Sequence, residues 1–68
     1  MPVITVEAMP MTVEAKRELV AALTCEASRI MQVPATSIYV FIKENPFDDI
    51  GVAEQLLSDI KSAQKSNQ

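Results

Sequence analysis

The chain has 68 residues, a net charge of −3 and a sequence pI of about 4.6. A domain this short buries only about 60% of its unfolded surface and usually depends on disulfides, a metal or partner subunits. Cys25 is the only cysteine and the chain has no His, so a disulfide framework is excluded and a metal site has no support. Because 49% of the residues are hydrophobic, self-association is the physical default.

Several classes of partner also lack support in the sequence. Lys and Arg do not cluster and aromatic residues are few, which argues against nucleic-acid binding. No apolar run approaches the roughly 20 residues that a membrane span requires. Pro2, Glu7 and Pro10 break the amino-terminal stretch, which does not resemble a signal peptide. We therefore expect a cytoplasmic protein that contacts neither membranes nor nucleic acid.

The first half of the chain predicts a strand followed by a long helix. Residues 3–8 are rich in β-branched side chains and partly alternate, which indicates a strand. Thr12 is a suitable helix N-cap, and Glu14 complements the helix dipole in the first turn. Residues 13–32 contain no Gly or Pro, and their apolar side chains fall on one broad arc. Pro34 prevents the helix from continuing.

The second half predicts another strand and a less certain terminal element. Residues 38–42 are apolar on both faces, which is typical of a strand buried on both sides. Asn45 and Pro46 end this strand. Residues 52–60 fit either a helix or a short hairpin.

A strand, a helix and a strand at this spacing predict a βαβ unit with parallel strands. Two strands are barely stable alone, so we expect at least a dimer that shares one sheet.

The arrangement of short motifs resembles the 4-oxalocrotonate tautomerase family. The matching features are the start Met1-Pro2-Val3-Ile4-Thr5-Val6, the helix length, Pro34-x-Thr36-Ser37 and Gly51-Val52-Ala53, and the likeness covers residues 2 to about 59. It implies the α+β class: a β-α-β, MIF-like subunit, a dimer with a four-stranded sheet and two helices, and a homohexamer built as a trimer of dimers. It also implies a hairpin at residues 52–57. We expect one domain over residues 1–60 and a polar tail over 61–68.

The resemblance assigns the catalytic role to Pro2. Once Met1 is removed, Pro2 carries a secondary amine, which can move a proton between carbon and oxygen of an enol or a 2-keto acid. A general base works best when its pKa is near the operating pH, and desolvation lowers the pKa of an amine. The implied function is a cofactor-independent tautomerase in which Pro2 is the general base.

The expected substrate contacts differ from those of the family's best-studied members. Those members bind dicarboxylates with two arginines and an aromatic wall, and the matching positions here are Met11, Tyr39 and Ile50. We take these three residues as the substrate-binding candidates, with Tyr39 able to donate a hydrogen bond to an enol oxygen. The loss of both arginines predicts a preference for monoacid enols or 2-keto acids.

A second interpretation remains open. The chain could be a non-catalytic family member, or a structural subunit of a mixed oligomer. The presence of Met1 and the missing arginines favour this interpretation, because a Pro2 nitrogen bonded to Met1 is an amide. The intact start Pro2-Val3-Ile4 favours the enzyme.

Overall fold

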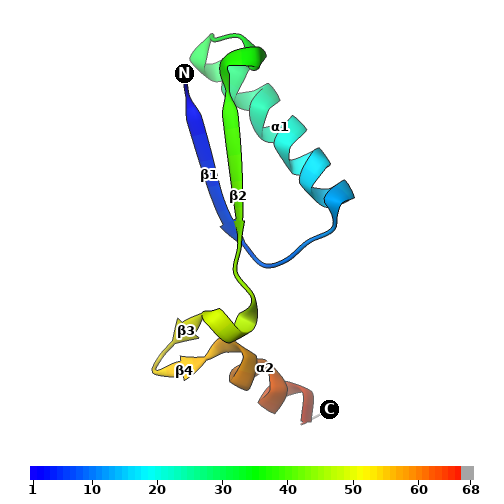
Figure 1. The fold of residues 1–68 in the computed structure, drawn as a ribbon, viewed down its shortest axis with the longest axis vertical. Helices are drawn as coiled ribbons and strands as arrows, with labels where there is room; N and C mark the ends of the chain where they lie inside the picture. Colours follow the sequence, from blue (N-terminus) through cyan, green and yellow to red (C-terminus); the bar gives the residue numbers. More distant parts are fainter. Residues whose placement is uncertain (67–68) are drawn as a thin grey trace.

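The computed structural model describes the backbone of residues 1–66 and the side chains of residues 1–63. Strands and helices follow one another along the chain in this order: β1 (Val3–Ala8), α1 (Val13–Met31), the 3₁₀ turn η1 (Ala35–Ser37), β2 (Tyr39–Glu44), the 3₁₀ turn η2 (Phe47–Asp49), β3 (Gly51–Val52), β4 (Gln55–Leu56) and α2 (Leu57–Ser66). Figure 1 shows that β1, β2 and α1 form one end of an elongated molecule, while η2, the β3–β4 hairpin and α2 form the other.

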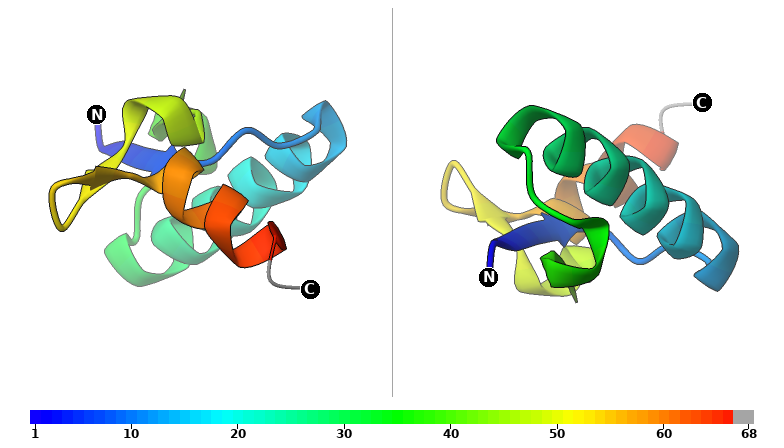
Figure 2. Two further views of the ribbon diagram at one scale, coloured as in Figure 1. Left: turned by 90° about the horizontal axis from the view of Figure 1, so that it is seen from below. Right: turned by 90° about the horizontal axis from the view of Figure 1, so that it is seen from above.

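Strands β1 and β2 form a parallel pair, as the strand–helix–strand pattern predicts. Six residue pairs join them in register, from Val3 beside Tyr39 to Ala8 beside Glu44. Helix α1 covers one face of this two-stranded sheet (Figures 1 and 2), and β1 alternates between half-buried and exposed side chains accordingly. The second strand was expected over residues 38–42. It begins one residue later and runs to Glu44, because β2 stays paired with β1 to the end of β1.

The caps of α1 explain its bounds. Thr12 is the N-cap, and its Oγ1 accepts a hydrogen bond of 3.1 Å from the amide of Ala15, as predicted. Gln32 adopts the left-handed conformation at φ 57° and ends the helix one residue earlier than expected. The Ser28 hydroxyl donates to the Val33 carbonyl at 2.6 Å, which fixes the chain as it leaves the helix.

The sequence of residues 52–60 fits either a helix or a short hairpin, and the carboxyl-terminal unit contains both. Strands β3 and β4 form an antiparallel hairpin, so the preferred hairpin is confirmed, and helix α2 begins directly after it. The Leu57 amide donates to the Ile50 carbonyl at 2.7 Å and closes the hairpin against the start of α2. Residues 61–66, expected as a polar tail, continue α2, and residues 67–68 lie outside the described part of the chain.

A single chain has no closed core. Its radius of gyration is 16.3 Å, whereas a compact domain of this length has about 11 Å. Its accessible surface is 5364 Å², whereas a folded monomer of this mass exposes about 4,200 Å². None of the side chains described in residues 1–63 is fully buried, and the exposed apolar ones include Val3, Tyr39 and Phe41. The described part of the chain therefore leaves a large apolar surface exposed.

The helices within residues 1–66 are each too short or too polar to cross a membrane.

Candidate active site

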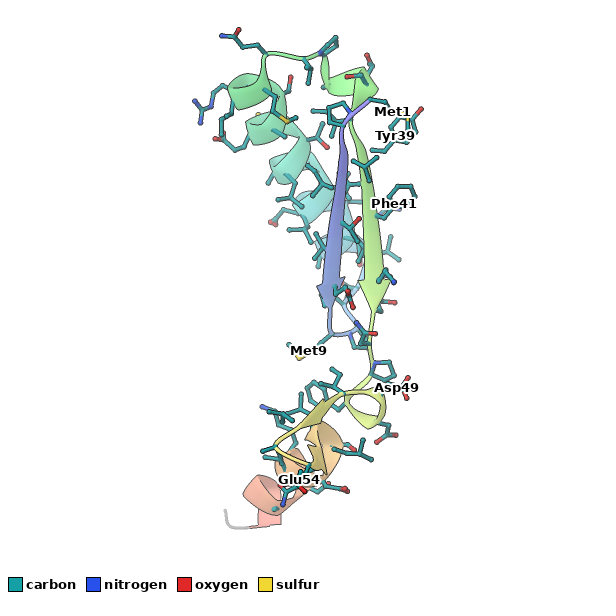
Figure 3. All side chains as sticks on the ribbon, turned by 90° about the vertical axis from the view of Figure 1, so that its left-hand side faces the viewer. Met1, Met9, Tyr39, Phe41, Asp49 and Glu54 are labelled. Carbon is teal, nitrogen blue, oxygen red and sulfur yellow. The ribbon has the colours of Figure 1, made fainter. Side chains whose placement is uncertain are left out.

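Pro2 lies at the amino end of the sheet. It precedes β1, is half-buried, and its carbonyl accepts a hydrogen bond of 3.0 Å from the Tyr39 amide. Met1 is 84% exposed at this end of the molecule. Figure 3 shows Met1 and Tyr39 side by side there. The sheet register thus brings together Pro2 and one of its expected substrate contacts.

The Tyr39 side chain projects from the face of the sheet that α1 leaves uncovered. Tyr39 is 50% exposed and Phe41, two residues further along β2, is 54% exposed. Figure 3 shows both side chains pointing away from the helix. This face also carries Val3, which pairs with Tyr39. Val3, Tyr39 and Phe41 therefore form an aromatic and aliphatic surface along this face of the sheet.

The other two expected contacts lie beyond the opposite end of the sheet. Met11 belongs to the loop after β1, and Ile50 follows η2 in the carboxyl-terminal unit. Strand β1 separates them from Pro2, and its six residues span about 20 Å at the usual rise of 3.3 Å per residue. One chain therefore does not bring Met11 or Ile50 to Pro2.

A polar cluster around Glu44 holds the loop after β1, and the sequence analysis did not identify it. The Glu44 carboxylate accepts a hydrogen bond of 3.0 Å from the Met11 amide and forms an ion pair of 3.0 Å with the Lys16 ammonium. The Met11 amide first, and the Lys16 ammonium second, hold the pKa of Glu44 below its ordinary value of 4.5. The side chain at the end of β2 thereby anchors the loop that carries Met11.

A pocket also opens at this end of the sheet, and no sequence motif indicated it. It has a volume of about 410 Å³ and is lined by five residues from the two segments that leave the sheet: Met9, Pro10, Pro46, Phe47 and Asp48. Four of the five are apolar. We call it the loop pocket.

Comparisons with known proteins identify the family. The family model described as tautomerase enzyme matches residues 2–60. The chain belongs to the tautomerase family. Its fold is the small α+β subunit of that family, and membership supports tautomerase activity in general. The comparison with curated proteins finds no match.

Several solved structures, among them homologues of 4-oxalocrotonate tautomerase, resemble this chain over nearly their whole length. One homologue is 35% identical, with a TM-score of 0.80 and coverage of 87% of this chain and 95% of its own. A structure from work on the isozymes of Methylibium petroleiphilum is 30% identical, with a TM-score of 0.84 and coverage of 91% and 98%. The DmpI protein of Archaeoglobus fulgidus is 34% identical, with a TM-score of 0.78 and coverage of 85% and 100%. These matches confirm the resemblance that the motifs carry.

Proposed function

We propose that this protein is a cofactor-independent tautomerase that interconverts the enol and keto forms of small 2-keto acids, with Pro2 as the general base. The observation that carries the proposal is the place of Pro2 in a chain of this family: it precedes β1 at a half-buried position beside Tyr39. Removal of the exposed Met1 gives Pro2 a free secondary amine.

The proposed chemistry is a proton transfer that returns the base to its starting state. The neutral Pro2 amine takes the hydroxyl proton of the enol, and the carbonyl group forms as the electron pair moves toward carbon. The resulting ammonium then gives its proton to that carbon. A general base is most effective when its pKa lies near the operating pH, and burial of an amine disfavours its charged ammonium form.

We further propose that the complete site forms between copies of the chain. Met11 and Ile50 lie about one strand length from Pro2 of their own chain, since a six-residue strand spans about 20 Å. A second copy that pairs antiparallel with the free edge of β1 places its own Met11 and Ile50 beside that Pro2. Such pairing also gives the four-stranded sheet of the expected dimer. Three dimers would then form the expected hexamer.

The proposed substrate is a monoacid enol or 2-keto acid. Met11, Tyr39 and Ile50 offer no positive charge, so the site lacks partners for two carboxylates. The Tyr39 hydroxyl is suited to donate a hydrogen bond to the enol oxygen, which gains negative charge as its proton leaves.

The test compares enol-to-keto rates in four preparations. They are processed wild type, Pro2→Ala, protein that retains Met1, and the control Pro34→Ala, which changes an exposed proline outside the proposed site. General acid–base catalysis contributes about 10²–10⁴-fold, so we expect a loss in that range for Pro2→Ala. Retained Met1 should reduce the rate further, because the Pro2 nitrogen is then an amide. Pro34→Ala should keep the wild-type rate.

The same experiment separates the enzyme from the second candidate, a structural subunit of a mixed oligomer. The amino acids at positions 11 and 39, Met and Tyr, favour that candidate because neither can neutralise a carboxylate. Equal rates in all four preparations would contradict the catalytic role of Pro2 and favour the structural subunit. Intact mass spectrometry of each preparation establishes whether Met1 is present.

A further inference from the structure

We propose that the loop pocket is the specificity site of this tautomerase and receives the apolar end of a monoacid enol bound at Pro2 of a second copy. The inference rests on the proposed function and adds to it a new site and the chemistry of the group that the site accepts.

The two walls of the loop pocket are held together by hydrogen bonds. Met9 and Pro10 follow β1, while Pro46, Phe47 and Asp48 follow β2. The Asn45 amide donates to the Ala8 carbonyl at 2.8 Å, directly before both walls begin. The Glu44 carboxylate holds the Met11 amide at 3.0 Å, directly after Pro10. Both segments are thus fixed at the pocket.

The size and lining of the loop pocket suit a hydrocarbon group. Its volume of about 410 Å³ lies within the 300–1,000 Å³ of ordinary ligand pockets, and an apolar cavity of about 150 Å³ already holds benzene. Phe47 supplies an aromatic surface and is half-buried, with the Lys61 ammonium 5.7 Å from the ring centroid. This cation–π contact helps to fix the ring in position.

The charges at the loop pocket oppose a second carboxylate. Asp48 is the only charged residue that lines it, and Asp49 follows directly. Among the described side chains, two cations lie nearby. The Lys16 ammonium is paired with Glu44 at 3.0 Å, and the Lys61 ammonium lies 5.7 Å from the centroid of the Phe47 ring, in the cation–π contact described above. A diacid would therefore place one carboxylate against apolar side chains and beside Asp48, which is unfavourable. A monoacid with an aryl or alkyl end avoids both costs.

The position of the loop pocket links it to Pro2 of a second copy. The pocket lies beyond the carboxyl end of β1, whereas Pro2 precedes the amino end. Antiparallel pairing through the free edge of β1 places the pocket of one copy near Pro2 of the other. A substrate at that junction can have its enol at Pro2 and its apolar end in the pocket.

The first test measures binding by the full-length oligomer, with trans-cinnamate as the aryl monoacid and trans,trans-muconate as the diacid. Calorimetric titration gives the two dissociation constants. Met9→Trp fills the loop pocket, and Met31→Trp is the matched control, because Met9 and Met31 are 53% and 51% exposed and only Met9 lines the pocket. We expect Met9→Trp to raise the dissociation constant for cinnamate by about tenfold or more. Tenfold is the lower end of the range of discrimination that steric effects give in an apolar pocket. Met31→Trp should bind cinnamate like wild type.

The second test reverses the charge at the loop pocket. Asp48→Lys should strengthen muconate binding relative to cinnamate by about tenfold, the lower end for one charge-assisted contact. Asp49→Lys is the control, since it makes the same charge change on a neighbour that does not line the pocket.

Two results would overturn the proposal. One is wild-type protein that fails to bind cinnamate. The other is equal behaviour of each variant and its control, which would show that a neighbouring subunit fills the pocket or that the ligand lies elsewhere. Binding does not require Pro2 to act as a base, so loss of turnover without loss of this binding pattern would contradict the proposed function alone.

Discussion

Truncation of Phe41 should weaken the assembly measurably if the uncovered face of the sheet is a subunit interface. Phe41 is 54% exposed in the single chain and does not belong to the proposed catalytic site. A Phe side chain has about 200 Å² of accessible surface, so association would bury about 110 Å² there. At about 25 cal/mol per Å², Phe41→Ala costs about 2.7 kcal/mol per subunit. In a two-fold interface, where both copies lose the ring, the dissociation constant should rise by about 10³–10⁴-fold.

Sedimentation velocity across a range of protein concentrations measures this effect. Wild type should sediment as a dimer-based oligomer, most simply as the expected hexamer, at micromolar concentration. Phe41→Ala should shift toward smaller species. Ile30→Ala is the control, because Ile30 is 66% exposed but lies on α1, away from the uncovered face.

Two outcomes would refute this reasoning. A folded wild-type monomer at micromolar concentration would mean that the chain does not need partners. Equal association of Phe41→Ala and wild type would mean that subunits do not meet through this face. Circular dichroism of each variant separates loss of association from loss of folding.

Three further predictions concern the substrate, pH and the hairpin. Positions 11 and 39 carry Met and Tyr instead of arginines, and each lost charge-assisted contact is worth about 1.5–3 kcal/mol. Processed protein should therefore turn over phenylenolpyruvate with a higher kcat/KM than 2-hydroxymuconate. A much higher kcat/KM for the diacid would contradict this. The pKa of Glu44 is lowered, so its contribution to stability is present above pH 4.5 and is lost as pH falls through the lowered pKa. The melting temperature of Glu44→Gln should therefore change less with pH over that acid range than the melting temperature of wild type. Equal pH dependence of the two melting temperatures would count against this. Ala53 and Glu54 have φ values of 53° and 68°, a conformation that is strained for these residues and suits Asn-Gly. Replacing the pair with Asn-Gly should raise the free energy of unfolding, measured with denaturant, by about 1 kcal/mol. An unchanged or lower free energy of unfolding would show that the turn is not strained.

The amino-terminal half of the fold was predictable because its signals are local and agree with one another. Alternation in residues 3–8, the Thr12 cap and an uninterrupted apolar arc each specify the same elements that the structure shows. The bounds shifted by one or two residues where a tertiary or backbone effect intervened. Gln32 entered the left-handed conformation, and pairing with β1 extended β2 to Glu44.

The carboxyl-terminal unit was less predictable because its elements are short. Two-residue strands carry no measurable alternation. The apolar spacing of residues 52–60 also fits a helix, but the chain is helical only from Leu57 onward. The turn between the strands has no Gly or Asn at its positive-φ positions, Ala53 and Glu54, so the usual hairpin signal is absent. Only the family resemblance favoured the hairpin.

Only part of the candidate site could be predicted from the sequence. Pro2 is recognisable because its chemistry depends on its position in the chain. Glu44 and the loop pocket depend instead on the strand register, which brings Glu44 to an amide 33 residues away and joins the segments after β1 and β2. Local patterns contain no information about such long-range contacts.

The elongated subunit supplies the physical reason for our proposal that catalysis and specificity depend on association. Pro2 and Tyr39 lie at one end of the sheet, while Met11, Ile50 and the loop pocket lie at the other. If two copies pair antiparallel, as proposed, each base meets the specificity residues of its partner. Substitutions near the loop pocket can then change substrate choice without altering the environment of the same chain's Pro2. A mixed dimer of one Pro2→Ala chain and one Met9→Trp chain would keep one site with neither substitution and combine both in the other. Such a dimer should therefore retain about half of the wild-type activity, whereas a site built within one chain would leave neither site intact.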